Sequence, residues 1–431
     1  MDRPPALVVA IAACTLSISA GASPTVTYTP SGELISSLSY DGTSACGNVI
    51  WDNSYETFRW TSAGGAVRLG LATVPLLSRG GGTPNISYSG KQVSASILSS
   101  DEQVTQGLWD LASGWTETMP PPPVGGALVD DGYGSAWGLS GDGKTVTGYF
   151  WSESYRAIAS AWTAAGGVVA LGQTEGRSGR ANATNYDGTV SCGWEEDETG
   201  SWFPRAWRNG VKIELSTADG GVTAAEYVNG DGSIIVGNSY DENLMLKVAT
   251  IWRWNGAEYV IDQIGTLPDT FPFDGEAAFL GITNDGSMAV GVNQYYWGYT
   301  EGFVWTAADG LMHASDFFAS VGASIPDTYT ILDCYNISAD GSTINATVQD
   351  SETFELFSAV VRLRAVCPGD LNNDGQVDDS DFVSFAAEYN VLDCADASMP
   401  GYCRADLNSD SVVDDADFVM FVPAYDQLVC P

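Results

Sequence analysis

Residues 139–148 read LSGDGKTVTG, and the chain repeats this phrase at nearly regular distances. An alternating apolar and polar run leads into Asp-Gly, whose glycine accepts the positive φ of a tight turn, and a β-branched run follows. Each copy therefore predicts a β-hairpin. The other copies are LSYDGTSACG (38–47), TNYDGTVSCG (184–193), VNGDGSIIVG (228–237), ITNDGSMAVG (282–291), ISADGSTINA (337–346) and a weaker ISYSGKQVSA (86–95).

The copies lie about 50 residues apart, which is the period of stacked supersecondary units such as a solenoid or a propeller. About twenty residues after each phrase, most units carry a second pair of runs around a Gly turn, as in SAWTAAGGVVALG (160–172) and FVWTAADGLM (303–312). Two hairpins give four strands, the makeup of a propeller blade. The sequence predicts an all-β, seven-bladed β-propeller over residues 23–364.

A tryptophan occupies one place in six of the seven units, where we expect a large ring to fill the space between blades. The six are Trp60, Trp109, Trp162, Trp207, Trp252 and Trp305. The seventh unit has AVVRL (359–363) at this place, as a less regular last blade would.

Residues 35 to 363 resemble the HAF-type extracellular repeat family. Units of that family combine an aromatic-x-Trp strand, a Gly turn, an apolar-Leu-Gly strand and an Asp-Gly hairpin, and the resemblance rests on seven spaced copies of such a unit, in which Phe58 and Phe303 keep the aromatic. The His that gives that family its name is absent from every copy. The resemblance implies a secreted β-propeller-like domain and no particular activity.

The segments that join the two hairpins of a unit are rich in aromatic and acidic residues, and in a propeller they fall on one face. Such a face suits sugars, which stack on rings and donate hydroxyls to carboxylates; it also suits basic partners, and an ordinary solvated acidic rim is the simpler interpretation. The candidate ligand face consists of Trp51, Trp151, Trp194 and Trp297.

Catalytic motifs are scarce. His313 is the single histidine, which argues against His-based triads and zinc centres, and it is interpreted as an ordinary strand or loop residue. No phosphate-binding loop or nucleophile elbow is present. Among 54 acidic residues no catalytic pair stands out.

Charge and the N-terminus bound the possible roles. The net charge of −37 argues against nucleic-acid binding. Residues 1–22 read as a signal peptide, with an apolar run and Ala20-Gly21-Ala22 as a cleavage site, so we expect an extracellular, bacterial protein. A lipoprotein anchored at Cys14 is the alternative. No later stretch is expected to cross a membrane.

Two calcium-type loops, DLNNDGQVDDSDF (370–382) and DLNSDSVVDDADF (406–418), stand in the tail, residues 366–431. Oxygen ligands at stepped positions, with a Gly at the sharp turn, are what a hard cation needs, so we expect two calcium ions. The expected ligands are Asp370, Asn372, Asp374, Gln376, Asp378, Asp381, Asp406, Asn408, Asp410, Val412, Asp414 and Asp417. Ser411 replaces the turn Gly in the second loop, which should strain it.

Each loop is followed by a helical pattern and preceded by no helix, because Cys367-Pro368-Gly369 cannot be one. This duplicated half EF-hand resembles the type I dockerin, which implies a cohesin-like protein partner. The family contacts its partner at the positions that here are Asp379-Ser380 and Asp415-Ala416, which depart from the Ser-Thr pair of cellulosomal dockerins.

Four cysteines surround these loops in an exported chain, where disulfides are expected. Pairing Cys394 with Cys403 and Cys367 with Cys430 would close the insert between the loops and clasp the ends, although spacing does not fix connectivity.

The main functional hypothesis is a secreted binding or scaffold protein, tethered through the dockerin-like module. One alternative is a carbohydrate-active enzyme, a polysaccharide hydrolase or lyase; another is a surface structural protein whose tail calcium stabilises. Aromatic and acidic side chains converging on the ring axis would favour the enzyme, and a flat rim would favour binding.

Overall fold

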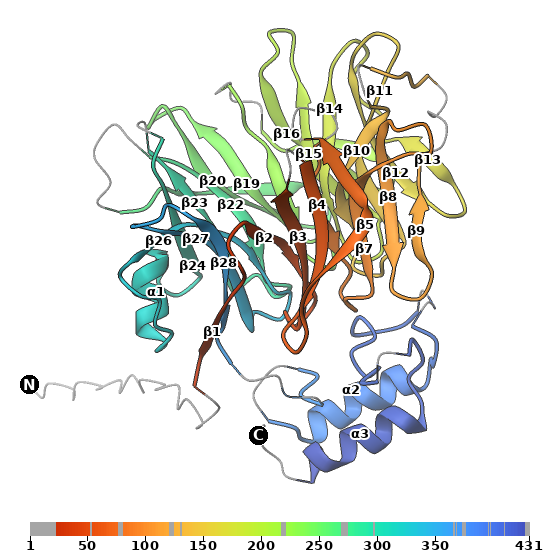
Figure 1. The fold of residues 1–431 in the computed structure, drawn as a ribbon, viewed down its shortest axis with the longest axis vertical. Helices are drawn as coiled ribbons and strands as arrows, with labels where there is room; N and C mark the ends of the chain where they lie inside the picture. Colours follow the sequence, from red (N-terminus) through yellow and green to blue (C-terminus); the bar gives the residue numbers. More distant parts are fainter. Residues whose placement is uncertain are drawn as a thin grey trace, which may run out of the picture.

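The structure is a computed structural model of a ring of seven sheets with two helices packed beneath it (Figure 1). It describes residues 23–426 except 52–53, 76–80, 120–124, 130–131, 217–220, 269–274, 296–297, 365–366, 368, 373–375, 395, 397 and 409. The predicted signal peptide, residues 1–22, and the lipoprotein alternative at Cys14 lie outside the described residues.

Each sheet has four antiparallel strands and forms one blade, so the predicted seven-bladed β-propeller is confirmed. The first six blades, in order, are β2 (Glu33–Leu38), β3 (Ser44–Trp51), β4 (Ser54–Thr61), β5 (Gly65–Pro75); β6 (Asn85–Ile86), β7 (Gln92–Leu98), β8 (Val104–Asp110), β9 (Gly114–Glu117); β10 (Gly134–Leu139), β11 (Thr145–Trp151), β12 (Ala157–Thr163), β13 (Gly167–Ala170); β14 (Gly179–Thr184), β15 (Val190–Glu196), β16 (Trp202–Arg208), β17 (Val211–Glu214); β18 (Ala225–Val228), β19 (Ile234–Asp241), β20 (Leu246–Trp254), β21 (Tyr259–Gly265); and β22 (Glu276–Ile282), β23 (Met288–Gln294), β24 (Thr300–Thr306), β25 (Gly310–His313).

The seventh blade is composite. It takes β26 (Tyr329–Ile337), β27 (Thr343–Asp350) and β28 (Leu356–Arg362) from the end of the repeat region, and its outer strand is β1 (Thr25–Tyr28). Thr25 pairs with Arg362 and Tyr28 with Ala359, so the two ends of the repeat region close the ring. Residues 359–363, which replace the repeated Trp strand in the seventh unit, lie mostly in this β28.

The six repeated tryptophans lie in the third strand of their blades. Trp60, Trp207, Trp252 and Trp305 are buried, and Trp109 and Trp162 are partly buried. The indole Nε1 of Trp252 donates to the Leu215 carbonyl of the preceding blade at 2.9 Å. These rings therefore pack at the seams between blades.

The Asp-Gly turns meet at one end of the ring axis, where hydrogen bonds link each turn to the next; all are between backbone groups except the one that Gly230 N donates to Asn284 Oδ1. Tyr40 N donates to Tyr88 O at 3.0 Å, and Asp340 N, in the last turn, donates back to Tyr40 O at 3.1 Å. Between them the chain of bonds runs through Gly141, Asp142, Tyr186, Gly230, Asn284 and Ala339. We call this end of the propeller the turn end.

Residues 367–426 form a small module below the turn end (Figure 1). Its helices are α2 (Asp379–Tyr389) and α3 (Asp415–Tyr425); the short helix α1 (Ala314–Ser320) belongs to the propeller core. Each module helix begins with a reciprocal capping box, between Asp378 and Asp381 in α2. Among the described residues no helix is both long and apolar enough to span a bilayer.

Candidate functional site: an axial cluster and two acidic loops

The innermost strands carry a β-bulge at one repeated position, five residues before the turn Asp of each unit. The register shifts there in six of the seven blades. A bulge bends a strand and re-aims its side chain, which is why bulges recur at functional sites. The bulged residues are Ser36, Trp137, Asn182, Glu226, Leu280 and Tyr335.

Arg180 lies two residues before the bulge of the fourth blade and contacts the bulged residues of its own blade and of the third blade. Its guanidinium carbon is 3.4 Å from the ring centroid of Trp137. Its Nε donates to Asn182 Oδ1 at 2.6 Å, and Asn182 Nδ2 donates to Glu226 Oε2 at 2.9 Å. Asn182 therefore bridges a cation and an acid on neighbouring blades.

Two acids of this region have perturbed protonation. Burial raises the pKa of Glu226, and the charge of Arg180 opposes that rise. Burial raises the pKa of Asp333 to about 6, although Thr347 N donates to its Oδ1 at 3.2 Å. The phenol of Tyr335 interacts electrostatically with Asp333, Glu226 and Arg180, so these groups converge from the fourth, fifth and seventh blades. We call Trp137, Arg180, Asn182, Glu226, Asp333 and Tyr335 the axial cluster.

The sequence did not single out the axial cluster. Aligning the seven copies on the turn Asp would have placed Trp137, Asn182, Glu226 and Tyr335 in one column, five residues upstream. These four residues supply an indole, an amide, a carboxyl and a phenol, whereas the neighbouring columns hold mostly apolar or small residues. The signal was present, but its meaning depends on the bulge.

Of the four tryptophans of the candidate ligand face, the structure describes the side chains of Trp151 and Trp194, and neither is fully exposed. Trp194 is 5% exposed and stacks on Trp202 with ring centroids 3.8 Å apart, and Arg180 lies 5.5 Å from its ring. Trp151 is partly buried and packs edge-on against Tyr149. The side chain of Trp51 and all of Trp297 lie outside the described part. Burial of Trp194 removes it from the outer rim and places it beside the axial cluster.

The turn end of the axis is filled by tyrosines. Tyr402, from the insert between the two acidic loops, packs against Tyr40, Tyr88 and Tyr186 with ring centroids 6.2, 5.8 and 4.9 Å away. A Cβ on Gly230 would lie 3.0 Å from the Tyr402 ring, so the glycine leaves the room that this ring occupies. The module thus caps the turn end.

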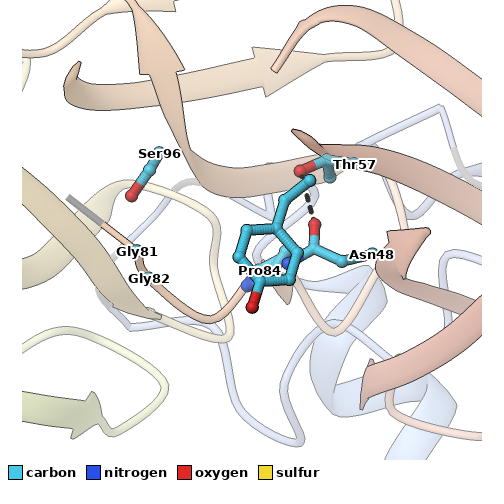
Figure 2. A pocket seen from close by; sticks show the side chains of 7 residues that line it. Asn48, Thr57, Gly81, Gly82, Pro84 and Ser96 are labelled. Atoms are coloured by element: carbon cyan, nitrogen blue, oxygen red, sulfur yellow. Dashed lines mark hydrogen bonds between the residues drawn. The ribbon is translucent and has the colours of Figure 1, made fainter. Parts of the chain in front are cut away.

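The cavities found among the described residues are small. One lies beside the axis near Tyr88 and is lined by residues of the inner strands, including Ser37, Gly138 and Tyr227. The other lies between the first two blades, where Asn48 and Thr57 are hydrogen-bonded and face Gly82 and Ser96 (Figure 2). Ser96 Oγ is buried without a hydrogen-bond partner, and a cavity of this size has room for about one water molecule.

The second acidic loop gathers three of its predicted calcium ligands. One carboxylate oxygen from each of Asp406, Asp410 and Asp417 lies within 4.8 Å of the others. Oxygens that share a calcium ion at 2.3–2.6 Å are at most about 5 Å apart, so this donor set fits calcium. Asn408, at the third position, already accepts Asp410 N on its Oδ1 at 2.8 Å.

The first loop is described only at its edges, because Asp374 falls outside the described residues. Asp381 is fully buried; its Oδ1 accepts the backbone N–H groups of Leu371 and Asn372, and its Oδ2 accepts Asp378 N. Asp370 is also buried. Asp381 therefore ties the start of the loop to the start of α2.

The residues predicted to meet a partner are exposed at the starts of α2 and α3. Asp379, Ser380, Asp415 and Ala416 all face solvent. Tyr389 OH donates to Asp415 Oδ1 at 2.7 Å, and Tyr425 OH donates to Asp379 Oδ1 at 2.5 Å. The last residue of each helix is thus hydrogen-bonded to the first residue of the other. The two halves of the module are related by approximate two-fold symmetry.

The described cysteines of the module and of the propeller differ in oxidation state. Cys394 and Cys403 form a disulfide that closes the insert carrying Tyr402, with Cα atoms 5.4 Å apart. Cys430 lies outside the described residues, so its pairing with Cys367 stays a prediction. Cys46, Cys192 and Cys334 are buried free thiols of the propeller. His313 ends β25 and pairs with Glu301 through Nδ1 at 2.6 Å.

Replacing Ser411 by Gly should strengthen calcium binding to the second loop about threefold. Ser411 has a φ of +79°, a conformation that costs a non-glycine residue about 1 kcal/mol. The loss of its contact with Lys91 Nζ (3.3 Å) and the flexibility of Gly in the unfolded chain offset part of the gain. In calcium titrations, the affinity should be highest for Ser411→Gly, lower for Ser411→Asn and lowest for the parent. A Gly variant that binds more weakly than the parent contradicts this account.

Replacing Asp333 by Asn should make stability less sensitive to pH. The folded pKa of Asp333, about 6, is above its unfolded value, so the stability that the protonated carboxyl contributes is present near pH 4 and is lost as the pH rises through 6. We expect the variant to match the parent at pH 4 and to exceed its unfolding free energy by about 2 kcal/mol at pH 7.5. Denaturant unfolding at both pH values checks this; equal differences at the two values refute it.

No family model matches the sequence, and no curated protein matches it. Among solved structures the chain is similar to the oligogalacturonate lyase of Vibrio parahaemolyticus (12% identity, TM-score 0.50, covering 78% of this chain and 90% of the lyase). It is also similar to the propeller domain of the trilobed protease of Pyrococcus furiosus (11%, TM-score 0.48, 77% and 98%). A third is prolyl oligopeptidase B of Galerina marginata (11%, TM-score 0.47, 80% and 52%).

The likeness to the lyase, at 12% identity, shows the fold alone and leaves the activity open. The chain is therefore a seven-bladed β-propeller protein. Its last blade is closed by the N-terminal strand, and a small helical module caps its turn end.

Proposed function

We propose that this chain is an exported binding protein whose propeller presents a ligand site on its axis and whose C-terminal module is a calcium-dependent, dockerin-like tether. The observation that carries the proposal is the division of the axis. Tyr402 of the module fills the turn end, and the axial cluster lies on the same axis beyond it. Ligand binding and tethering thus have separate surfaces.

The tether part of the proposal is supported by the outward face of α2 and α3. This face carries apolar side chains beside the acidic helix starts, and Val383 and Val419 occupy matching positions with 67% and 69% exposure. The other exposed apolar residues are Phe382, Phe418 and Met420. A cohesin-like protein module with an apolar centre and a basic rim fits this face.

A carbohydrate-active enzyme is the second candidate, because aromatic and acidic side chains do converge on the axis. Glu226 and Asp333 have raised pKa values, which general acids need. A Glu226→Gln variant separates the candidates. If polysaccharide breakdown is seen with the parent and lost in the variant, the protein is an enzyme; if breakdown is absent from both, the binding function stands.

Two measurements test the binding and tethering roles. On a glycan array, the full chain should bind with or without chelator, because the propeller carries the site. Attachment to the surface of the producing cells should require calcium and should be lost in a Val383→Glu/Val419→Glu double variant that keeps its glycan binding. Calcium-independent attachment contradicts the tether, and a blank array together with unaltered attachment favours a surface structural protein.

A further inference from the structure

The arginines of the propeller differ in how their guanidinium groups are satisfied. Arg59, Arg208 and Arg362 flank the seam position of their third strands and donate to turn carbonyls: Arg59 Nε to Gly90 O at 2.7 Å, Arg208 Nη1 to Gly232 O at 2.9 Å, and Arg362 Nη2 to Gly42 O at 3.1 Å. These three arginines join neighbouring blades, so their role is structural.

Arg180 belongs to a first strand and has no such partner. Its Nε donates to Asn182, but among the described residues neither Nη1 nor Nη2 makes a hydrogen bond, and no carboxylate oxygen lies within 4.0 Å of the guanidinium nitrogens. One face of the guanidinium is covered by Trp137 at 3.4 Å, and the side chain is only partly exposed. A partly desolvated cation with two unused donor groups is costly to hold in the folded state.

The groups around Arg180 indicate which ligand would accept hydrogen bonds from its Nη1 and Nη2. The Nη groups of arginine form a planar fork that matches a carboxylate, which binds it through two parallel hydrogen bonds. Glu226 and Asp333 are acceptors once ionised, so they suit hydroxyl groups on the same ligand. Both side chains are partly exposed, as are Trp137 and Tyr335, so solvent-sized space reaches the cluster.

Position along the strands supports a ligand that lies across the axis. Arg180 and Asp333 are each seven residues before the turn Asp of their units, in the fourth and seventh blades, which lie across the ring from each other. The residues at the same position in four other blades are small, so Arg180 and Asp333 carry the two charged side chains of this level. The small residues are Gly82, Ser135, Ala224 and Ala278.

The geometry points to a binding site for a small sugar acid in the axial cluster: Arg180 receives the carboxylate, and Glu226 and Asp333 accept hydrogen bonds from hydroxyl groups. This assignment rests on the proposed binding function and names its ligand class. The net charge of −37 repels an extended polyanion, so a single carboxylate on a monosaccharide or at a chain end is favoured over a long acidic polymer.

Calorimetric titration of the full chain in calcium tests this, with D-glucuronate and D-glucose as probes. Glucuronate should bind at least about tenfold more tightly than glucose, because a buried charge-assisted pair is worth at least that factor. Arg180→Gln should weaken glucuronate binding about thirtyfold and leave glucose unchanged. Arg180→Lys keeps the charge and loses the planar fork. Its affinity for glucuronate should lie between those of the parent and of Arg180→Gln. Arg208→Gln, a seam control, should lower the melting temperature and keep the affinity.

Equal affinity for the two sugars, no binding of glucuronate by the parent, or full affinity in a folded Arg180→Gln variant each overturns the assignment. If Arg180→Gln does not fold, the Lys variant decides by the same criterion. The proposed binding function fails separately: an array on which neutral glycans alone bind refutes the sugar acid and leaves that function standing, whereas an array with no binding refutes both.

Discussion

A chain that lacks residues 23–28 should melt about 10 °C below the parent. Those residues contain β1, the outer strand of the seventh blade, so their removal opens the ring at its closure. Tyr28 packs edge-on against Tyr329 and Phe357, with centroids 5.4 and 5.7 Å apart. Loss of a packed aromatic side chain costs about 3–5 kcal/mol, and each kcal/mol lowers the melting temperature of a large domain by roughly 2–4 °C.

The control for this truncation is a Thr25→Ala/Thr27→Ala double variant, because both side chains are exposed while the backbone pairing is kept. It should melt within about 1 °C of the parent, as surface substitutions do. Differential scanning calorimetry gives both values. If the truncated chain has the same melting temperature as the parent, β1 does not close the ring in solution, and the seventh blade is stable with three strands.

Removing calcium should release α2 and α3 while the propeller stays folded. From residue 366 to 431 there are 14 acidic residues and one arginine, so the module has strong internal repulsion that two bound cations would relieve. Hydrogen exchange measured by mass spectrometry should show protection of 379–389 and 415–425 falling at least tenfold in chelator, with the blades unchanged. Equal protection with and without calcium contradicts calcium-coupled folding.

Within the module, Asp381→Ala should remove more helix protection than Asp417→Ala. Asp381 accepts three backbone N–H bonds while fully buried, and Asp417 accepts two, from Asn408 and Asp414. Each lost bond to a charged acceptor costs about 1.5–3 kcal/mol. Asp381→Asn keeps the side-chain shape and part of the cap, so its loss should be smaller. A larger effect at Asp417 would assign the stabilising site to the strained loop.

The number of blades was predictable because its signal is local and repeated. A turn that favours Asp-Gly, and a seam that favours a large ring, as beside Arg59 and Arg208, impose the same residue types on most units. The acidic loops were predictable for the same reason, since calcium needs oxygens at fixed spacing within twelve residues. Ser411 shows the precision of such signals: a missing glycine predicted strain, and its φ is +79°.

The axial cluster itself was not predicted from the sequence, and only its neighbour Trp194 was. Trp194 could be recognised as an unusual aromatic beside acids, but whether its ring faces solvent or Arg180 depends on how the blades pack. Glu226 and Asp333 are two acids among 54, and nothing adjacent to them in sequence marks them. They become distinct only where bulged strands of different blades meet.

By itself, the sequence determined the seven four-stranded units, their turns and seams, and the two acidic loops, because each depends on residues within about 50 positions of one another. Tertiary structure alone decided that Thr25–Tyr28 completes the last blade, that Tyr402 caps the turn end and that Arg180 faces Trp137 with its Nη donors unused. Strand addition uses backbone hydrogen bonds that any short extended run can supply, and the other contacts join residues of different units. Such contacts leave no periodic mark, because they exist only after the ring has closed.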